Sequence, residues 1–461
     1  MKVRNVADAK PVGRRWRLTG AVCAATVGMM ITAGCEVTNP GPVQDEFLFA
    51  ESSHAPLVAG AERRLAQLIK NLAYDGALMS RELFPTGQIG AHGHPVTFQG
   101  GHLPDNDTYM NGRWNFGQQA RWIAENALER FIEDGAIPPE EQANNPLITD
   151  AHITAAFATR IMGEHWCDAV LDGGAPESNE AWFQRAEEHF TAAIGMAPDA
   201  QRRDAATAGR AQVRMWLGDW AGAVSDAQQI STDFNHSAVM DADPDGARNR
   251  IWFSTVDLPY RTITTWNSWQ YEYYNETGDP RVPSVDPGLG FSTGALSGFG
   301  QVPFRRQLKY PNGDSDMRLA GGVEMRLIEA EALLREGTWE PAMDLINEVR
   351  TRNVSDITGQ PMEAWSASSL EEAWEYLKRE RFIEFWLEGR RMGDMRRWED
   401  TGAPGAIDWM DFESMSPIFA QNPRSRCYTI PTNERNANPN VPVELPTDIH
   451  FASPGDTPGQ G

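Results

Sequence analysis

The chain has 461 residues and a formal net charge of −23. A surface this acidic repels the phosphate groups of nucleic acids and anionic lipids, so we expect no nucleic-acid partner. After residue 35 no stretch approaches the roughly 20 apolar residues that a membrane-spanning helix needs. The length also exceeds one usual compact core, which favours two lobes or a helical scaffold that carries a large insert.

The first 34 residues have the pattern of an export signal. Lys2, Arg4 and further basic residues precede an uncharged stretch from Leu18 to Gly34. Such a basic start followed by a short apolar run is typical of a cleaved signal peptide. The closing letters Thr-Ala-Gly-Cys resemble a lipobox, although Thr32 stands where Leu is preferred. We therefore predict a lipoprotein signal peptide over 1–34, lipid on Cys35 and an extended tether over 35–50, with cleavage as an ordinary signal peptide as the alternative.

The apolar spacing then predicts a series of helices. Leu57, Ala61, Leu65, Leu68 and Leu72 recur every three or four residues, as on one face of a helix. Residues 84–113, rich in Gly, Pro, His and Asn, are expected to form a loop. The predicted helices span 54–73, 114–134, 150–170, 180–197, 202–218 and 220–232.

Two of the predicted turns share one pattern. Residues 218–223 and 337–342 match at Gly, at Trp two positions later and at Ala five positions later. Gly ends a helix, the aromatic ring fills the corner, and Ala lets the next helix pack closely. This resembles the tetratricopeptide turn and predicts a mainly α fold of helix pairs. Between the pairs lies an insert over 234–318, rich in Pro, Gly and aromatic residues, that we expect to be loop-rich and to face a ligand.

The insert contains the densest aromatic cluster of the chain. Its aromatic residues alternate with Asn, Ser, Gln and Glu. Two explanations fit this pattern equally well. The rings either pack on the scaffold, or they stack on the faces of sugar rings while the amides and carboxylates form hydrogen bonds with the sugar hydroxyls. Neighbouring Pro, Gly and Asn favour a loop or strand. The candidate ligand-binding residues are Trp266, Trp269, Tyr271, Tyr273 and Tyr274, and a second patch contains Tyr109 and Trp114.

A short acidic segment in the insert has the spacing of a calcium loop. Asp241, Asp243 and Asp245 occupy positions 1, 3 and 5 of an EF-hand pattern, with Gly246 at position 6. Position 12, which normally provides a bidentate Glu, is Trp252. We expect no required cofactor and keep calcium at these three residues as a hypothesis beside a plain surface turn.

Cys167 and Cys427 are the cysteines that remain after Cys23 of the signal and the lipidated Cys35. An exported protein forms disulfides readily, so these two residues either pair or stay as buried thiols. The spacing alone leaves both alternatives open.

The C-terminal part carries the most specific pattern. Arg381, Glu384, Phe385, Glu388, Gly389, Arg391, Asp394, Arg397 and Trp398 follow without a gap the signature of the SusD/RagB family, and Pro431, Glu434, Asn438 and Pro439 resemble its closing segment. The spacing of three also predicts that Arg381 lies beside Glu384 and Glu388 beside Arg391. We interpret these charges as structural ion pairs on a buried helix.

The resemblance to the SusD/RagB family implies a scaffold, a place and a role. It implies a SusD-like superhelix of α-helices, with a helical region over 51–233, a C-terminal region over 319–440 and a flexible tail over 441–461. It further implies a nutrient-binding lipoprotein of the outer membrane that delivers its ligand to a SusC-like TonB-dependent barrel and has no enzymatic activity.

Several functions stay open at this point. A glycan is the leading ligand and a peptide is the runner-up, because the family includes both kinds of member. A protein-binding scaffold of the tetratricopeptide kind is a further alternative. A polysaccharide hydrolase has less support, since the Gly-x-Ser-x-Gly pattern around Ser292 lies among Pro and Gly residues rather than between a strand and a helix.

Overall fold

The computed structural model describes residues 48–85, 98, 101, 103, 108–243, 246–256, 261–292, 301–405 and 425–444. Residues 1–48 and 49–461 form two separate units, and the second holds all of the fold discussed below. The predicted signal peptide, Cys35, most of the tether and nearly all of the predicted tail lie outside the described residues.

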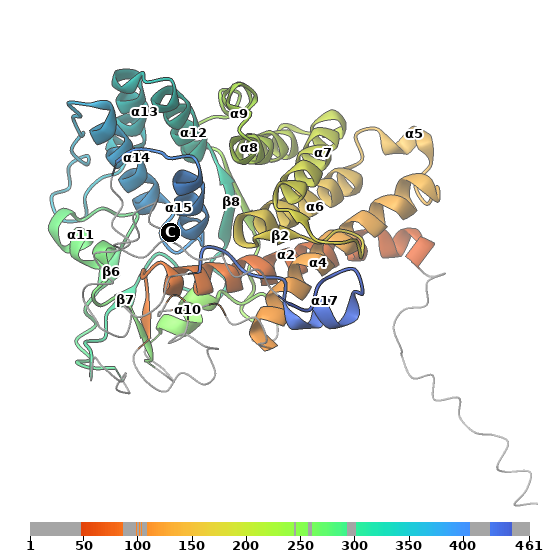
Figure 1. Cartoon of the computed structure of the whole chain (residues 1–461), viewed down its shortest axis with the longest axis horizontal. Helices are drawn as coiled ribbons and strands as arrows, with labels where there is room; N and C mark the ends of the chain where they lie inside the picture. The colour runs from red at the N-terminus through yellow and green to blue at the C-terminus, as the bar shows by residue number, and fades with distance from the viewer. Residues whose placement is uncertain are drawn as a thin grey trace, which may run out of the picture. The chain divides into compact units, whose positions relative to one another are not determined.

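The fold is mainly α, as predicted (Figure 1). None of the described helices is long and apolar enough to cross a membrane. The α-helices are α2 (Glu51–Met79), α4 (Thr108–Leu128), α5 (Pro139–Gln142), α6 (Pro146–His165), α7 (Glu180–Met196), α8 (Ala200–Leu217), α9 (Trp220–Ala227), α10 (Arg250–Thr255), α11 (Trp269–Thr277), α12 (Gly322–Arg335), α13 (Trp339–Thr351), α14 (Leu370–Glu384), α15 (Arg391–Asp400) and α17 (Thr432–Ala437), and a short π-helix, Glu129–Glu133, extends α4.

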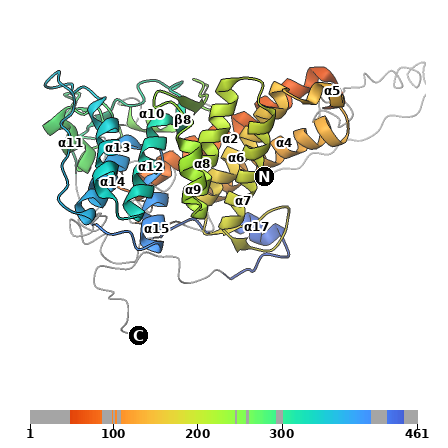
Figure 2. The same ribbon diagram turned by 90° about the horizontal axis from the view of Figure 1, so that it is seen from above.

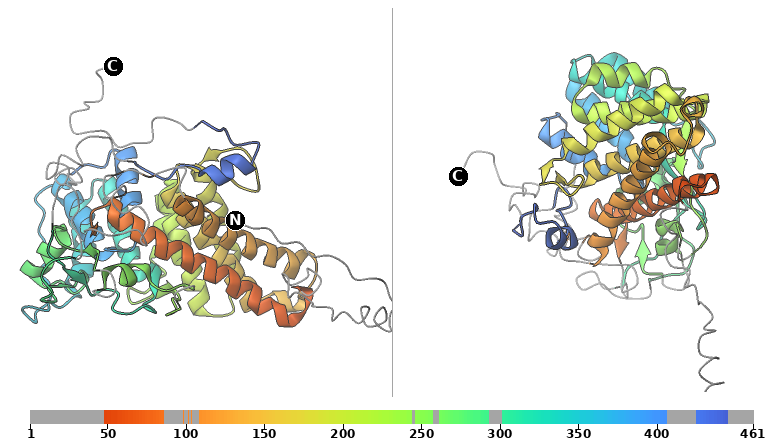
Figure 3. Two further views of the ribbon diagram at one scale, coloured as in Figure 1. Left: turned by 90° about the horizontal axis from the view of Figure 1, so that it is seen from below. Right: turned by 90° about the vertical axis from the view of Figure 1, so that its right-hand side faces the viewer.

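Neighbouring helices pack in chain order along the unit. α2 lies against α4, α4 against α6, α6 against α7, and α7 against α8. The row continues through α9, α12, α13 and α14, as Figure 2 shows from above. The long helix α2 crosses beneath this row, and its C-terminal half is buried (Figure 3). One continuous apolar core therefore joins the N-terminal helices to the C-terminal ones.

Both predicted tetratricopeptide-like turns are present. Gly218 ends α8 with φ 78°, and α9 begins at Trp220. Gly337 follows α12 with φ 81°, and α13 begins at Trp339. A positive φ is a conformation that glycine adopts without steric cost. Ala223 and Ala342, the small residues of the pattern, are both fully buried.

The strands are short and pair in twos. They are β1 (Phe84–Pro85) with β5 (Ile263–Thr264), β2 (Asp168–Ala169) with β3 (Glu177–Ser178), β4 (Asn235–Ala238) with β8 (Met317–Gly321), and β6 (Ser284–Val285) with β7 (Arg306–Gln307), all antiparallel. In the β4–β8 ladder Asn235 lies opposite Gly321 and Ala238 opposite Met317. The predicted insert over 234–318 thus leaves the helical scaffold and returns to it at one place.

The family signature forms two helices rather than one. α14 ends at Glu384, and the chain turns through Leu387 at φ 61° and Gly389 at φ 73° before α15 begins. A Cβ atom on Gly389 would lie 3.0 Å from the Cα atom of Ala73 in α2. Glycine is therefore required here both for the positive φ and for the close approach of α2.

Cys167 and Cys427 form a disulfide. The bond joins the segment after α6 to the segment before α17, 260 residues further along the chain. Backbone hydrogen bonds flank it, from Cys167 N to the Tyr428 carbonyl at 2.9 Å and from Tyr428 N to the His165 carbonyl at 2.7 Å. Of the two alternatives that the spacing left open, pairing is the one that the structure shows.

Candidate functional site

Four of the five aromatic residues of the cluster, all except Trp266, lie in the helix α11, so our prediction of a loop or strand was wrong for them. Ser268 caps α11 by accepting a hydrogen bond from Tyr271 N at 3.2 Å. Gly278 ends the helix with φ 66°. A Ser cap and a terminal glycine are the standard signals of helix ends, and here they outweigh the low helix propensity of the aromatic residues between them.

One side of α11 belongs to the core. The rings of Trp269 and Tyr273 stack with centroids 4.7 Å apart, and Trp269 also stacks on Phe382 of α14 at 5.3 Å. The Tyr273 hydroxyl accepts a hydrogen bond from Arg350 Nη1 at 2.8 Å. These contacts hold α11 in place: Tyr273 is buried, whereas Trp269 is half-buried and stays a candidate ligand contact.

The remaining three aromatic residues of the cluster are half-buried and keep part of their surface in solvent. Trp266, just before α11, lies edge-on to Phe84 of β1 with ring centroids 6.1 Å apart. The Tyr271 hydroxyl accepts a hydrogen bond from Arg305 Nε at 2.8 Å. The Tyr274 hydroxyl donates to Asp356 Oδ2 at 3.0 Å. Fixed polar contacts therefore orient the tyrosine rings, and each ring keeps part of its surface in solvent.

Charged groups accompany these half-open rings. Arg305 pairs with Asp286 at 3.0 Å, and its guanidinium lies 5.8 Å from the centre of the Tyr271 ring. An aromatic face beside a guanidinium and a carboxylate offers both stacking and hydrogen bonding to a polar ligand. We define the α11 surface as Trp266, Tyr271 and Tyr274 with Arg305 and Asp286.

The second predicted patch is divided by the structure. Trp114 is 1% exposed, lies edge-on to Trp166 and Trp182, and donates from Nε1 to Glu434 Oε2 at 3.0 Å. The prediction that Trp114 contacts the ligand is therefore corrected: Trp114 is a core residue that joins α4 to α17. Tyr109 is half-buried beneath the guanidinium of Arg113, 5.3 Å from the ring centre. The rest of this patch, in 86–107, falls largely outside the described residues.

The acidic segment of the insert forms a turn that its own side chains close. Asp241 accepts hydrogen bonds from Asp243 N at 2.9 Å and from Ala247 N at 3.0 Å. Arg63 of α2 lies 4.0 Å from Asp241 and 3.7 Å from Asp243. Asn249 then caps α10, so the chain enters a helix before position 12 of the EF-hand pattern. Asp245 lies outside the described residues.

Calcium at this turn stays a proposal with a simple test. A bound ion would stabilise the folded state by mass action. The proposal predicts a higher melting temperature in millimolar calcium than in chelator, with the difference lost in Asp243→Asn. Melting curves of the wild type that coincide in the two buffers would remove the calcium site and leave Arg63 as the partner of these carboxylates.

The family signature supplies a buried ion network rather than an exposed site. The structure shows partners other than the predicted neighbours: Arg381 binds Asp394 at 2.8 and 2.9 Å, and Glu388 binds Lys309 and Arg318. Glu384, on the same helix as Arg381, is engaged by Arg318 and Arg281, and Glu388 lies in the turn between α14 and α15, outside the helical spacing. The network also includes the pairs Arg397–Glu331, Arg390–Glu324, Arg318–Glu384 and Arg281–Glu380.

The charges of this network are stabilised by their partners. Burial raises the pKa of Glu384, but the guanidiniums of Arg318 and Arg281 outweigh burial and lower it to about 2. Arg318 bonds to Glu384 at 2.7 Å and to Glu388 at 2.9 Å. An ion pair without access to solvent fixes the packing of elements, which agrees with the structural interpretation of the signature.

The Ser292 hydroxyl, the candidate nucleophile of the Gly-x-Ser-x-Gly pattern, is buried. It is 4% exposed and donates to the carbonyl of Val302 at 3.2 Å. Its neighbour Phe291 forms an isolated antiparallel bridge with Pro303. Among the described residues, Ser292 is therefore covered by a bridge between two segments of the insert, whereas a nucleophile elbow exposes its serine.

These features define the chain as an α-helical protein of tetratricopeptide-like helix pairs, with an insert that presents partly open aromatic rings. Its residues 308–444 match the model of the SusD family. No curated protein sequence matches the chain.

Solved structures share the fold over most of the chain. A SusD superfamily protein from Parabacteroides distasonis ATCC 8503 has a TM-score of 0.61 at 15% identity, covering 85% of this chain and 98% of the other. A SusD superfamily protein from Bacteroides vulgatus ATCC 8482 has a TM-score of 0.60 at 15% identity with the same coverage. A SusD-like carbohydrate binding protein from that organism has a TM-score of 0.55 at 13% identity, covering 75% and 83%. The family-model match places residues 308–444 with the SusD/RagB family, and the likenesses to solved structures show that the chain shares the fold.

Proposed function

We propose that this protein captures a glycan at the cell surface and delivers it to a SusC-like TonB-dependent barrel in the outer membrane. The observation that carries the proposal is the α11 surface, where Tyr271 and Tyr274 are half-buried and held by hydrogen bonds. Sugar rings stack their C–H faces on such aromatic rings while polar neighbours bind the hydroxyls. One of the structural relatives is a SusD-like carbohydrate binding protein, which supports the same class of ligand.

The proposal contains no chemical step. The two carboxylates that bond to groups of the α11 surface are engaged, Asp286 by Arg305 and Asp356 by Tyr274. Glycoside hydrolysis needs one carboxyl group that gives a proton and a second that acts as base or nucleophile. Release of reducing sugar by the pure protein would contradict a binding role.

A direct comparison of ligand classes tests the proposal. We expect neutral polysaccharides such as amylopectin, galactomannan, arabinoxylan or laminarin to retard the protein in affinity gel electrophoresis, and a library of unstructured peptides not to compete. Binding of the peptides with no retardation by any polysaccharide would replace the glycan by the peptide alternative. A protein that binds neither, but captures a folded partner, would support the scaffold alternative.

The proposed place at the outer membrane rests on Cys35. A lipid on this residue would hold the body at the membrane, since no described helix can span it. We expect Cys35→Ala to leave a folded protein that moves from the outer-membrane fraction to the soluble fraction, whereas Cys23→Ala changes nothing. Retention of Cys35→Ala in the outer-membrane fraction of cells without a partner barrel would contradict the anchor.

A further inference from the structure

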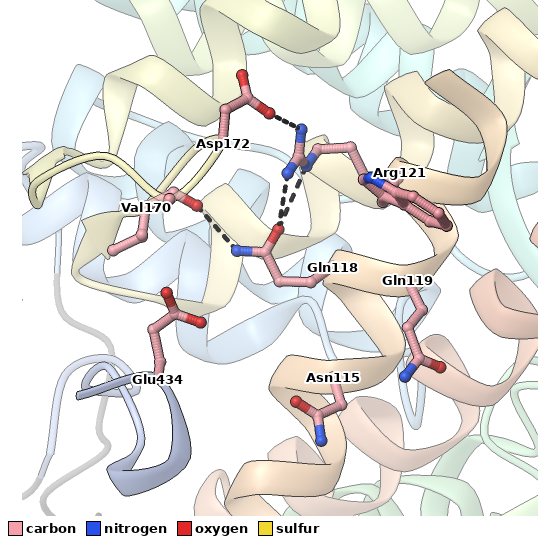
Figure 4. Close-up of a pocket in the computed structure, with 9 residues that line it drawn as sticks. Asn115, Gln118, Gln119, Arg121, Val170, Asp172 and Glu434 are labelled. Carbon is pink, nitrogen blue, oxygen red and sulfur yellow. Dashed lines mark hydrogen bonds and ion pairs between the residues drawn. The ribbon is translucent and has the colours of Figure 1, made fainter. Parts of the chain in front are cut away.

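A pocket of about 260 Å³ lies apart from the α11 surface, between α4, the turn after β2 and α17 (Figure 4). Its lining residues are Asn115, Gln118, Gln119, Arg121, Trp122, Val170, Asp172, Gly173 and Glu434. Most of these side chains carry amide, carboxylate or guanidinium groups. We call it the α4 pocket. These polar groups, set among apolar surface, favour a ligand that carries both hydrogen-bonding groups and C–H faces.

One wall of the pocket is fixed by a chain of hydrogen bonds. Arg121, 4% exposed, donates to Gln118 Oε1 at 3.1 Å and to Asp172 Oδ1 at 2.8 Å. Gln118 in turn donates to the Val170 carbonyl at 2.8 Å. Asp172 has φ 52°, a left-handed conformation, and a second ion pair with Arg185 at 2.6 Å holds it there. These groups keep their positions without a ligand.

The opposite wall is the carboxylate of Glu434. Its Oε2 atom accepts from Trp114 Nε1 at 3.0 Å, and its Oε1 atom accepts from Asn438 Nδ2 at 3.1 Å. Each carboxylate oxygen has a further lone pair, so both can also accept from a ligand hydroxyl. The hydrogen bond from the buried Trp114 indole therefore fixes the orientation of the Glu434 carboxylate, the acceptor, before a ligand binds.

The rim of the pocket is open and lies along one face of α4. Asn115, Gln119 and Trp122 follow at spacings of four and three residues, so their side chains share that face. Trp122 is 59% exposed, a rare exposure for a ring of this size. Within the part of the chain that the structure describes, the Gln119 carboxamide has no hydrogen-bond partner, and Asn115 is bonded only through Oδ1, which accepts from Asn433.

We propose that the α4 pocket binds one neutral sugar ring of a glycan, as a second subsite separate from the α11 surface. Glu434 and the amides of Asn115 and Gln119 can form hydrogen bonds with the hydroxyl groups of a sugar ring. The Trp122 indole offers a face on which the C–H groups of the same ring can stack. Asp172, Glu434 and Glu125 outnumber the guanidiniums of Arg121 and Arg185, which disfavours acidic sugars and phosphates. The volume admits a single ring. The class of ligand in this inference rests on the proposed function, whereas the location of the site rests on the pocket alone.

Fluorine NMR of the purified full chain labelled with 5-fluorotryptophan tests this subsite. The probes are maltohexaose, cellohexaose, mannohexaose, xylohexaose and laminarihexaose. The Trp122 resonance is identified by its loss in Trp122→Phe, and that of Trp266 by its loss in Trp266→Phe. We expect at least one hexasaccharide to shift the Trp122 resonance in a saturable way. Gln119→Ala should weaken that titration about tenfold, the size expected for losing a well-placed polar contact. Gln201→Ala, an exposed glutamine on α8, should leave it unchanged.

The outcomes separate the subsite from the proposed function. Shifts at Trp266 without any at Trp122 would overturn the subsite and keep glycan capture at α11. No shift of any tryptophan resonance with any hexasaccharide would overturn both. A Trp122 titration that is equal in Gln119→Ala and wild type would overturn the proposed geometry. A Trp122 shift caused by unstructured peptides and by none of the sugars would assign the pocket to a peptide and overturn the saccharide inference.

Discussion

Arg397→Ala should lower the free energy of unfolding by about 3–5 kcal/mol, the usual cost of removing one partner from a buried ion pair. The Arg397 side chain is 4% exposed and binds Glu331, whose side chain is fully buried. It also lies 3.2 Å from Asp394. Without the guanidinium, Asp394 keeps Arg381, but the fully buried Glu331 keeps only the partly exposed Arg335 at 3.2 Å and Trp398 Nε1 at 3.2 Å in place of its two bonds to Arg397. Chemical denaturation measures the loss.

The matched control is an ion pair at the surface. Arg352 pairs with Asp233, and their side chains are 37% and 85% exposed. Arg352→Ala should cost at most about 1 kcal/mol because water screens exposed pairs. The double variant Arg397→Met with Glu331→Gln should recover part of the loss, since it removes the unpaired charge. Equal stability of Arg397→Ala and Arg352→Ala would contradict the structural interpretation of the signature.

Trp114→Ala should also cost about 3–5 kcal/mol of stability, as large-to-small substitutions of buried aromatic residues do. The ring fills the space between Trp166 and Trp182, and its Nε1 atom anchors Glu434. The control lies two turns further along α4: Trp122→Ala removes the same side chain from an exposed position and should change stability by about 0.5 kcal/mol or less. A Trp114→Ala variant as stable as Trp122→Ala would return Trp114 to the candidate ligand contacts.

Local sequence signals predicted the scaffold. The Gly-Trp-Ala pattern at 218–223 and 337–342 identified two turns because a helix end and its corner are decided by neighbouring residues. The same kind of signal was available for α11, in the Ser268 cap and Gly278, but the aromatic content pointed to a loop or strand. Tertiary contacts of Trp269 with Phe382 stabilise a helix that intrinsic propensity disfavours.

The candidate sites depend on contacts that spacing along the chain does not contain. Trp114 and Trp122 lie on one helix, yet one is buried by Trp166 and Trp182 while the other faces solvent. The α4 pocket needs Glu434, 320 residues away from its hydrogen-bond partner Trp114. The Asn-Pro segment around Glu434 resembled the family, but its contact with α4 follows only from the folded chain. For the same reason the Arg381–Asp394 pair was missed across the turn at Gly389.

The central claim is that the open rings of the α11 surface bind a glycan, and one paired measurement tests it most directly. Isothermal titration and thermal melting are performed on wild type, Trp266→Ala and Tyr271→Ala with the polysaccharide that binds best. Losing a stacking ring should weaken binding by roughly 1–3 kcal/mol, by analogy with bases stacked on aromatic side chains, or about tenfold to a hundredfold. We predict this loss in at least one variant with little change in melting temperature. Variants that melt lower yet bind the polysaccharide with wild-type affinity would contradict the account and assign α11 to the scaffold.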